Sequence, residues 1–87
     1  ALEYFQKSLK INKEVKDKQG ISYNLHNIGD IYNKQNNYPL ALEYYEKSLK
    51  IKKEMNNKWA VTYTLKGLSE VYQKQKNYEK SIEYAQE

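Results

Sequence analysis

Residues 41–55, ALEYYEKSLKIKKEM, repeat residues 1–15, ALEYFQKSLKINKEV, almost letter for letter. The alignment continues without a gap from residues 21–38, ISYNLHNIGDIYNKQNNY, over residues 61–78, VTYTLKGLSEVYQKQKNY, and SIEYAQE at 81–87 begins a third copy. The repeat period is forty residues, which is typical of an array of similar structural units. Because the chain starts inside one unit and stops inside another, we expect it to be a piece of a longer array.

The stretch from residue 39 to residue 55 has the pattern of an α-helix. Its apolar and small residues fall in one arc about 200° wide when each residue advances by about 100°. One neighbouring helix cannot cover so wide an arc, so we expect this helix to lie between two others. Pro39 in the first turn and Asn37 just before it indicate the start of the helix, with Asn37 as the N-cap.

The whole chain reads as helices, because its β-branched residues recur at helical spacing and not in alternating runs. The expected fold class is all-α, an α-solenoid of antiparallel helix pairs. Helices are predicted at 1–16, 20–35, 38–55, 58–75 and from 78 onward, with turns at Asn36-Asn37 and Asn56-Asn57. We expect a single array over 1–87: the second helix of one repeat at 1–16, a full repeat at 20–55 and a partial repeat at 58–87.

The inward-facing positions of these helices predict the core. They are Leu25, Ile28, Tyr32, Leu42, Tyr45, Leu49, Leu65, Leu68 and Tyr72.

The composition of the 87 residues excludes several classes of site. There is no cysteine and one histidine, so disulfides, thiol nucleophiles and structural zinc sites are ruled out, and the lack of cysteine fits the cytoplasm. No apolar run approaches the roughly 20 residues of a membrane helix. The formal charge is +4, and every cation is lysine. Without arginine, specific nucleic-acid recognition is disfavoured, which leaves non-specific binding through surface lysines as a weak alternative.

The residues also carry a family resemblance. Leu25, Ile28, Gly29 and Tyr32, followed by Ala41, Tyr45 and Ser48, resemble the tetratricopeptide repeat signature of large, large, small, large and then small, aromatic, small. The pattern recurs at Leu65, Leu68, Ser69, Tyr72, Ser81 and Ala85. The forty-residue period resembles the long-helix variety found in bacterial signalling proteins and in Pins/LGN scaffolds. Gly29 is expected to let the two helices of a repeat approach closely.

The resemblance implies a protein–protein interaction module with a right-handed superhelix and a concave groove that holds a peptide. The residues expected to line this groove are Tyr23, His26, Asn27, Asp30, Asn33, Lys34, Trp59, Tyr63, Lys66, Glu70, Gln73 and Lys74. Trp59 and Tyr63 are the expected anchors, because exposed aromatics are typical of interfaces. An alternative is that Trp59 folds back over Met55 or the Asn56-Asn57 turn. A structural spacer or oligomerisation segment is the alternative function.

The groove charges have two interpretations. Asp30–Lys34, Lys66–Glu70 and Glu70–Lys74 are spaced as ion pairs that support a helix, each worth about 0.2–0.5 kcal/mol, and this interpretation is favoured. The family's chaperone adaptors hold a C-terminal carboxylate at the matching positions. Here those positions include Asp30 and Glu70, which would repel a carboxylate.

No enzyme chemistry or cofactor is predicted. His26, Asp30 and Glu70 could form a three-ligand metal site, but the spacing signal is weak. Ser8 and Ser48 are small residues at helix crossings with no base nearby, and the glycines do not have the spacing of a phosphate-binding loop.

The ends of the array are expected to weaken the chain. The wide apolar arc of helix 1–16 lacks a preceding partner, and the helix that follows 58–75 is short. We therefore expect marginal stability and self-association through the open repeat ends.

Overall fold

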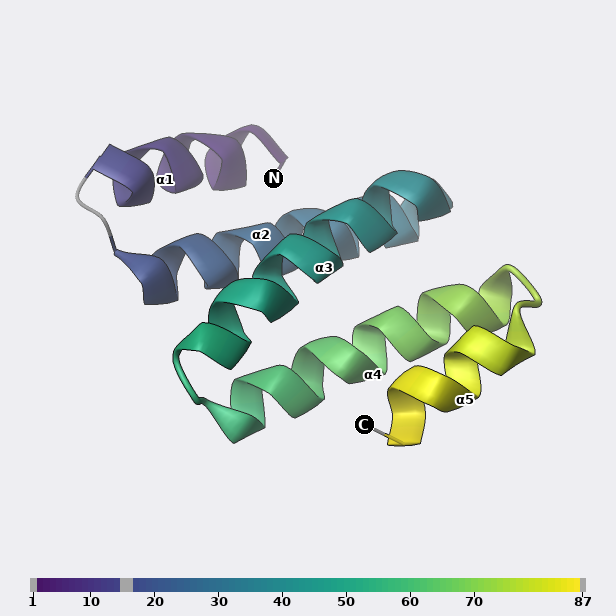
Figure 1. The fold of residues 1–87 in the computed structure, drawn as a ribbon. Coiled ribbons are helices and arrows are strands. Elements are labelled where there is room, and N and C mark those ends of the chain that lie inside the picture. Colours follow the sequence, from purple (N-terminus) through teal and green to yellow (C-terminus); the bar gives the residue numbers. More distant parts are fainter. Residues whose placement is uncertain (1, 15–16, 87) are drawn as a thin grey trace.

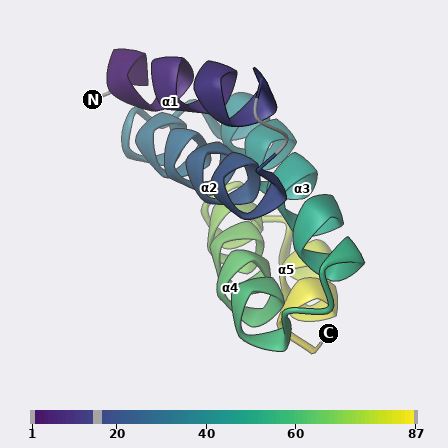
Figure 2. The same ribbon diagram turned by 90° about the vertical axis from the view of Figure 1, so that its left-hand side faces the viewer.

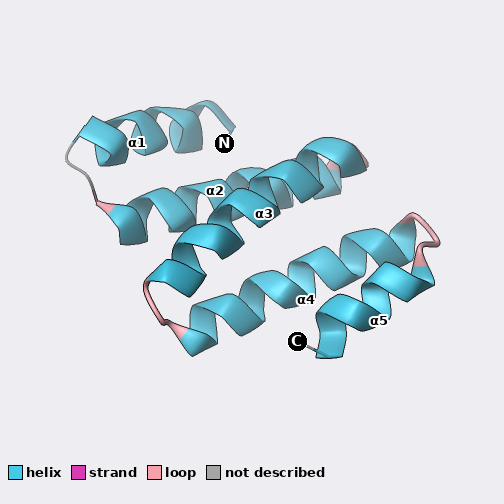
Figure 3. Cartoon of the chain, in the orientation of Figure 1, coloured by secondary structure: helices cyan, strands magenta, loops and turns pink. Residues whose placement is uncertain are grey.

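The computed structural model describes residues 2–14 and 17–86, and within these ranges it contains five helices and no strand (Figures 1 and 3). They are α1 (Leu2–Glu14), α2 (Lys18–Lys34), α3 (Tyr38–Glu54), α4 (Lys58–Lys74) and α5 (Tyr78–Gln86). The all-α prediction is confirmed, and the predicted boundaries agree to within two residues wherever they fall on described residues. Residues 1, 15 and 16 of the predicted first helix lie outside them.

Three helices end in the same turn. Asn36, Asn56 and Lys76 adopt positive φ angles of 60°, 56° and 62°. After α2, the Asn36 amide donates to the Asn33 carbonyl and the Asn37 amide donates to the Tyr32 carbonyl. This is the Schellman arrangement, which satisfies the last carbonyls of a helix. The same pair of bonds follows α3 and α4, so the repeat of the sequence is also a repeat of turn geometry.

The helix starts differ from the prediction at two points. α2 begins at Lys18, two residues early, because the Asp17 side chain accepts a hydrogen bond from the Gly20 amide at 3.1 Å. Asn37 occupies the N-cap position of α3, but its side chain makes no capping bond. Pro39 lies in the first turn and lacks the N–H that a cap could use. The equivalent Asn57 does cap α4, accepting from Ala60 at 3.2 Å.

The helices form antiparallel pairs in two layers. In Figure 2, α2 and α4 lie next to each other in one layer, and α3 and α5 lie in the other. α3 packs against both α2 and α4, which confirms that its wide arc is shared between two neighbours. The buried apolar residues are Leu25, Ile28, Ala41, Tyr45, Leu49, Leu65, Leu68 and Val71.

Three residues predicted to be buried are only half-buried. Tyr32 stacks on Tyr44 with ring centroids 5.6 Å apart, and Tyr72 stacks on Tyr84 at 5.4 Å. Each pair joins two neighbouring helices, and all four rings belong to partly exposed residues. Leu42 is also partly buried and packs against the core.

Tyr45 is the residue on which the three central helices meet. A Cβ added at Gly29 of α2 would lie 2.9 Å from its ring, and one added at Gly67 of α4 would lie 3.2 Å from it. The close approach expected at Gly29 is therefore present, and α4 approaches the same ring. One turn later on α3, the buried Ser48 hydroxyl donates to the Ser22 carbonyl at 2.8 Å. This hydroxyl therefore takes part in the packing of α3 against α2.

Candidate functional site

The layer formed by α2 and α4 carries three exposed aromatic side chains. Tyr23 is 63% exposed, Tyr63 is 61% exposed and Trp59 is 88% exposed. Tyr23 and Tyr63 are equivalent positions of successive repeats. The exposure of Trp59 contradicts the alternative in which it folds back over Met55 or the following turn.

Tyr63 is fixed in place by side chains from the other two central helices. Its ring lies on the His26 imidazole of α2 with centroids 4.5 Å apart and planes at 33°. The Lys52 ammonium of α3 lies 5.8 Å from the centre of the same ring. One side of Tyr63 is therefore packed while the side chain as a whole remains largely exposed, which makes it a preformed aromatic surface.

His26 itself is not a groove-surface residue, which corrects the prediction. It is 5% exposed, because α4 closes over it and its ring packs between Tyr45 and Tyr63. Its Nδ1 lies 3.2 Å from the Thr64 hydroxyl, and Lys52 donates to that same hydroxyl at 2.6 Å. Thr64 accepts from Lys52 and keeps its own proton, so its hydroxyl is able to donate to Nδ1 of His26.

Nε2 of the imidazole faces the Asp30 carboxylate at 3.4 Å, and because a carboxylate only accepts, the proton of the neutral ring lies on Nε2 and Nδ1 accepts from Thr64. Tyr45 donates to the same carboxylate. A polar chain therefore runs from Lys52 through Thr64 and His26 to Asp30 and joins α2, α3 and α4. It satisfies groups that would be costly to bury alone.

Burial sets the protonation states along this chain. Burial lowers the pKa of His26 to about 4, although Asp30 raises it and Lys52 lowers it further to a smaller degree. The His26–Asp30 contact therefore joins a neutral ring to a carboxylate at neutral pH. Burial also lowers the pKa of Lys52 to about 8, while Asp30 opposes the shift. Burial and Asp30 together raise the pKa of Tyr45, which keeps its hydroxyl protonated as a donor.

The other residues predicted to line the groove differ in how far they are buried. Asn33 is buried and accepts a hydrogen bond from Lys74 at 3.1 Å, which makes a second polar contact between α2 and α4. Asn27 is half-buried, and within the described ranges its amide nitrogen has no hydrogen-bond partner. The exposed members are Lys34, Lys66, Glu70, Gln73 and Lys74.

Among residues 2–14 and 17–86, the three predicted helix-supporting ion pairs do not form. Asp30 instead receives Tyr45 and faces His26, and Lys74 donates to Asn33. For Asp30 and Lys74, these contacts between helices replace the expected pairs along one helix. The weak three-ligand metal site is also not assembled: in the described part of the chain no three His, Cys, Asp or Glu side chains converge.

Lys52 and Thr64 are site residues that the sequence reading missed. Lys52 lies eleven residues after Ala41, on the same stripe as Tyr45 and Ser48. Three helical turns bring it back to the centre of the apolar arc. A lysine at that position was the available signal for a buried cation.

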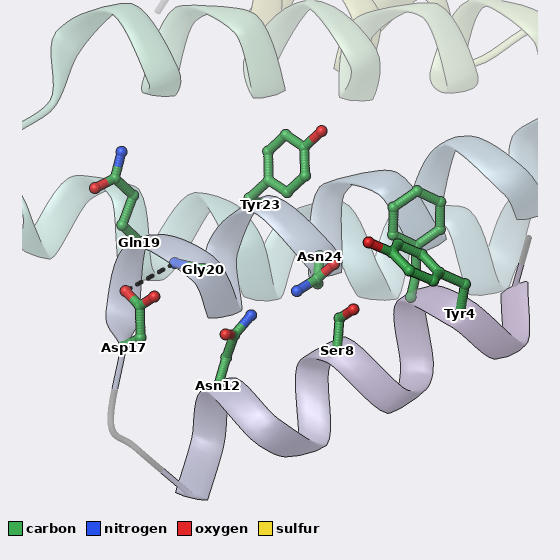
Figure 4. Close-up of a pocket in the computed structure, with 9 residues that line it drawn as sticks. Tyr4, Ser8, Asn12, Asp17, Gln19, Gly20, Tyr23 and Asn24 are labelled. Atoms are coloured by element: carbon green, nitrogen blue, oxygen red, sulfur yellow. Dashed lines mark hydrogen bonds between the residues drawn. The ribbon is translucent and has the colours of Figure 1, made fainter.

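A pocket of about 580 Å³ continues the aromatic face at the α1 end (Figure 4). It is lined by Tyr23, Asn24 and Gly20 of α2 and by Ser8, Asn12 and Tyr4 of α1. The equivalent space in the next repeat lies between Ser48 of α3 and Thr64 of α4, forty residues after Ser8 and Asn24. There α2 fills the space, because the Ser22 carbonyl bonds to Ser48 and His26 bonds to Thr64. The pocket therefore corresponds to the space that α2 occupies in the next repeat.

The profile of the tetratricopeptide repeat family matches residues 1–54. The chain belongs to the tetratricopeptide repeat family. Among solved structures, the apo form of RapI is similar with a TM-score of 0.88 and 34% identity, covering 95% of this chain and 30% of the RapI chain. The designed protein DA05 is similar with a TM-score of 0.82 and 27% identity, covering 90% of this chain and 78% of DA05. The comparison with curated proteins gave no match.

Tetratricopeptide repeats generally mediate contacts between proteins. This chain spans less than a third of RapI, so the similarity concerns the repeat stack. Across residues 2–14 and 17–86, no helix combines the length and apolar character needed to cross a bilayer.

Proposed function

We propose that the face formed by α2 and α4 binds a peptide segment of another protein. Trp59 and Tyr63 are its principal anchors, and Tyr23, Asn27 and Lys66 are secondary contacts. The observation that carries the proposal is that Tyr63, largely exposed, is held against the buried His26. A side chain that is already ordered loses little entropy when a ligand packs on it.

The aromatic side chains account for the affinity expected at this face. Tyrosine and tryptophan offer a large apolar area together with a polar atom, and they are enriched among the residues that dominate interface energies. Trp59 lies one turn before Tyr63 on α4, so both rings project from the same side of the helix. A ligand that covers both would remove a large apolar area from water.

Asn27 supports a peptide in preference to a purely apolar ligand. Its amide nitrogen is a buried donor with no partner in the described structure. When the Asn27 side chain turns outward, a peptide carbonyl would supply the missing acceptor, which is favourable because an unpaired buried donor is costly.

The exposed charged residues on this face do not favour a ligand of one particular charge. Lys34 and Lys66 lie on the same face as Glu70, and Asp30 is engaged with Tyr45. Two of the positions that match a carboxylate clamp are engaged in internal contacts, because His26 is buried and Asp30 accepts a hydrogen bond from Tyr45. These facts support recognition along the peptide and not of its C-terminal carboxylate.

We propose that this non-catalytic role is carried out in the cytoplasm, which the absence of cysteine supports.

The test is selection of binders from a displayed peptide library, followed by affinity measurement with variants. The Trp59→Ala, Tyr63→Ala double variant is expected to weaken binding of the selected peptide by about 30-fold or more. Tyr78→Ala is the control, because Tyr78 is 58% exposed on α5 and outside the proposed face. Equal affinities for the wild type and the double variant would contradict the proposal. Failure to select any binder would favour a structural spacer.

A further inference from the structure

A second groove, of about 480 Å³, lies between α1 and α3 with α2 as its floor. Ile21 and Leu25 of α2 face into it, and they lie on the opposite side of that helix from Tyr23. The groove is therefore separate from the α2–α4 face. We propose that it binds an acidic amphipathic segment of a partner protein.

Apolar side chains give the groove its floor. Leu9 of α1 and Ile51 of α3 join Ile21 and Leu25, and all except Leu25 remain partly exposed. Tyr44 forms one wall, where its ring is held by stacking on Tyr32 with an angle of 23° between the planes. Partly exposed apolar side chains in a concave setting gain by covering with apolar groups of a ligand.

Lysines on the rim specify the charge of the occupant. Lys13 and Lys50 are exposed, and neither has an ion-pair partner in the described part of the chain. Lys47 also lines the groove, and it already pairs with Glu43 at 3.7 Å. Two cations are therefore available to carboxylates of a ligand.

Glu54, the one carboxylate among the described lining residues, does not cancel this charge. Glu54 lies 3.9 Å from Lys18, so its charge is balanced from outside the groove. An occupant that presents apolar side chains to the floor and carboxylates to Lys13 and Lys50 is complementary in both respects. A segment with apolar residues at helical spacing and glutamates on both flanks meets these requirements.

The probe is a fluorescein-labelled peptide with leucines at helical spacing and glutamates on both flanks, and its affinity is measured by fluorescence anisotropy. The Lys13→Gln, Lys50→Gln variant is expected to bind it about fivefold more weakly, since two exposed ion pairs are lost. The control is Lys76→Gln, Lys80→Gln, which removes the same charge from exposed positions at the α5 end and should bind as the wild type does. A peptide with glutamine in place of each glutamate should bind weakly to all three proteins.

Two results would overturn the proposal. One is equal weakening by both lysine pairs, which would show a general effect of net charge. The other is equally tight binding of polyglutamate or of a DNA duplex, because neither presents leucines to the floor. Trp59→Ala, Tyr63→Ala should leave binding of this peptide unchanged, so the outcome is independent of the function proposed for the α2–α4 face.

Discussion

Tyr45 makes the contacts that hold the middle of this array together. Its ring lies between Gly29 of α2 and Gly67 of α4, and its hydroxyl donates to Asp30. The small residue at position 29 could be recognised from the sequence pattern. The contact between Gly67 and Tyr45 could not be recognised in this way. In the repeat alignment, position 67 is equivalent to Asn27 and not to Gly29.

The two glycines provide a matched pair of substitutions. Alanine adds about 1 kcal/mol of helix propensity at either position. At Gly29 the new methyl group would lie 2.9 Å from the buried Tyr45 ring, whereas at Gly67 the distance is 3.2 Å. We expect Gly29→Ala to lower the free energy of unfolding by about 1–2 kcal/mol, and Gly67→Ala to change it by less. Urea unfolding measures both, and equal stabilities would contradict the packing described for Tyr45.

His26 predicts how stability depends on pH. Its pKa is about 4 in the folded chain, against a usual value of 6.5. Between these values the unfolded chain holds the extra proton, so the free energy of unfolding decreases as the pH falls from 6.5 towards 4. The slope from this one group is at most about 1.4 kcal/mol per pH unit. His26→Gln should show a flatter pH dependence of unfolding over this range, and an unchanged dependence would refute a buried neutral imidazole.

Asn27 should separate stability from binding. Its amide nitrogen is buried and has no partner within the described residues, so Asn27→Ala is expected to leave the melting temperature unchanged or to raise it slightly. The same substitution should weaken binding of a library-selected peptide, because a ligand carbonyl would lose its donor. Thermal unfolding and anisotropy on the same preparation give both results. A clear loss of stability would mean that Asn27 serves the fold.

At the scale of elements, the helices follow directly from local patterns in the sequence. The turns at Asn36-Asn37 and Asn56-Asn57 were predicted from residue type, and the structure shows why asparagine suits them: the first adopts positive φ and the second starts the next helix. The sequence pattern predicts a helix start at Gly20 and therefore misses the cap at Asp17. The pattern also predicts Asn37 as the N-cap of α3, but its side chain makes no capping bond.

The two asparagines at equivalent helix starts allow a direct comparison. Asn57 accepts from Ala60 at 3.2 Å, whereas the Asn37 side chain makes no capping bond. Asn57→Ala is therefore expected to lower the free energy of unfolding by about 1 kcal/mol, and Asn37→Ala by a few tenths of that at most. Chemical denaturation of the two variants measures the difference. Equal losses would show that side-chain capping does not distinguish the two helix starts.

For the whole molecule, the forty-residue period predicted the stack of helices, and the wide apolar arc predicted which helix lies in the middle. The contacts between α2 and α4 could not be read in the same way. His26 and Thr64 are distant in the sequence, and their bond depends on how far α4 leans over α2. Polar residues assigned to the groove, His26 and Asn33, were therefore buried by a neighbouring repeat, while the aromatic residues of the same face remained exposed.

Amide chemical-shift mapping shows whether a peptide ligand lies on the α2–α4 face, as proposed. Titration of a library-selected peptide into the ¹⁵N-labelled chain should perturb amides from Tyr23 to Asp30 on α2 and from Trp59 to Glu70 on α4. The indole N–H of Trp59 should shift as well, since this side chain is 88% exposed in the free chain. Perturbations confined to α1, α3 and α5, with no shift of the Trp59 indole N–H, would contradict peptide binding at the α2–α4 face.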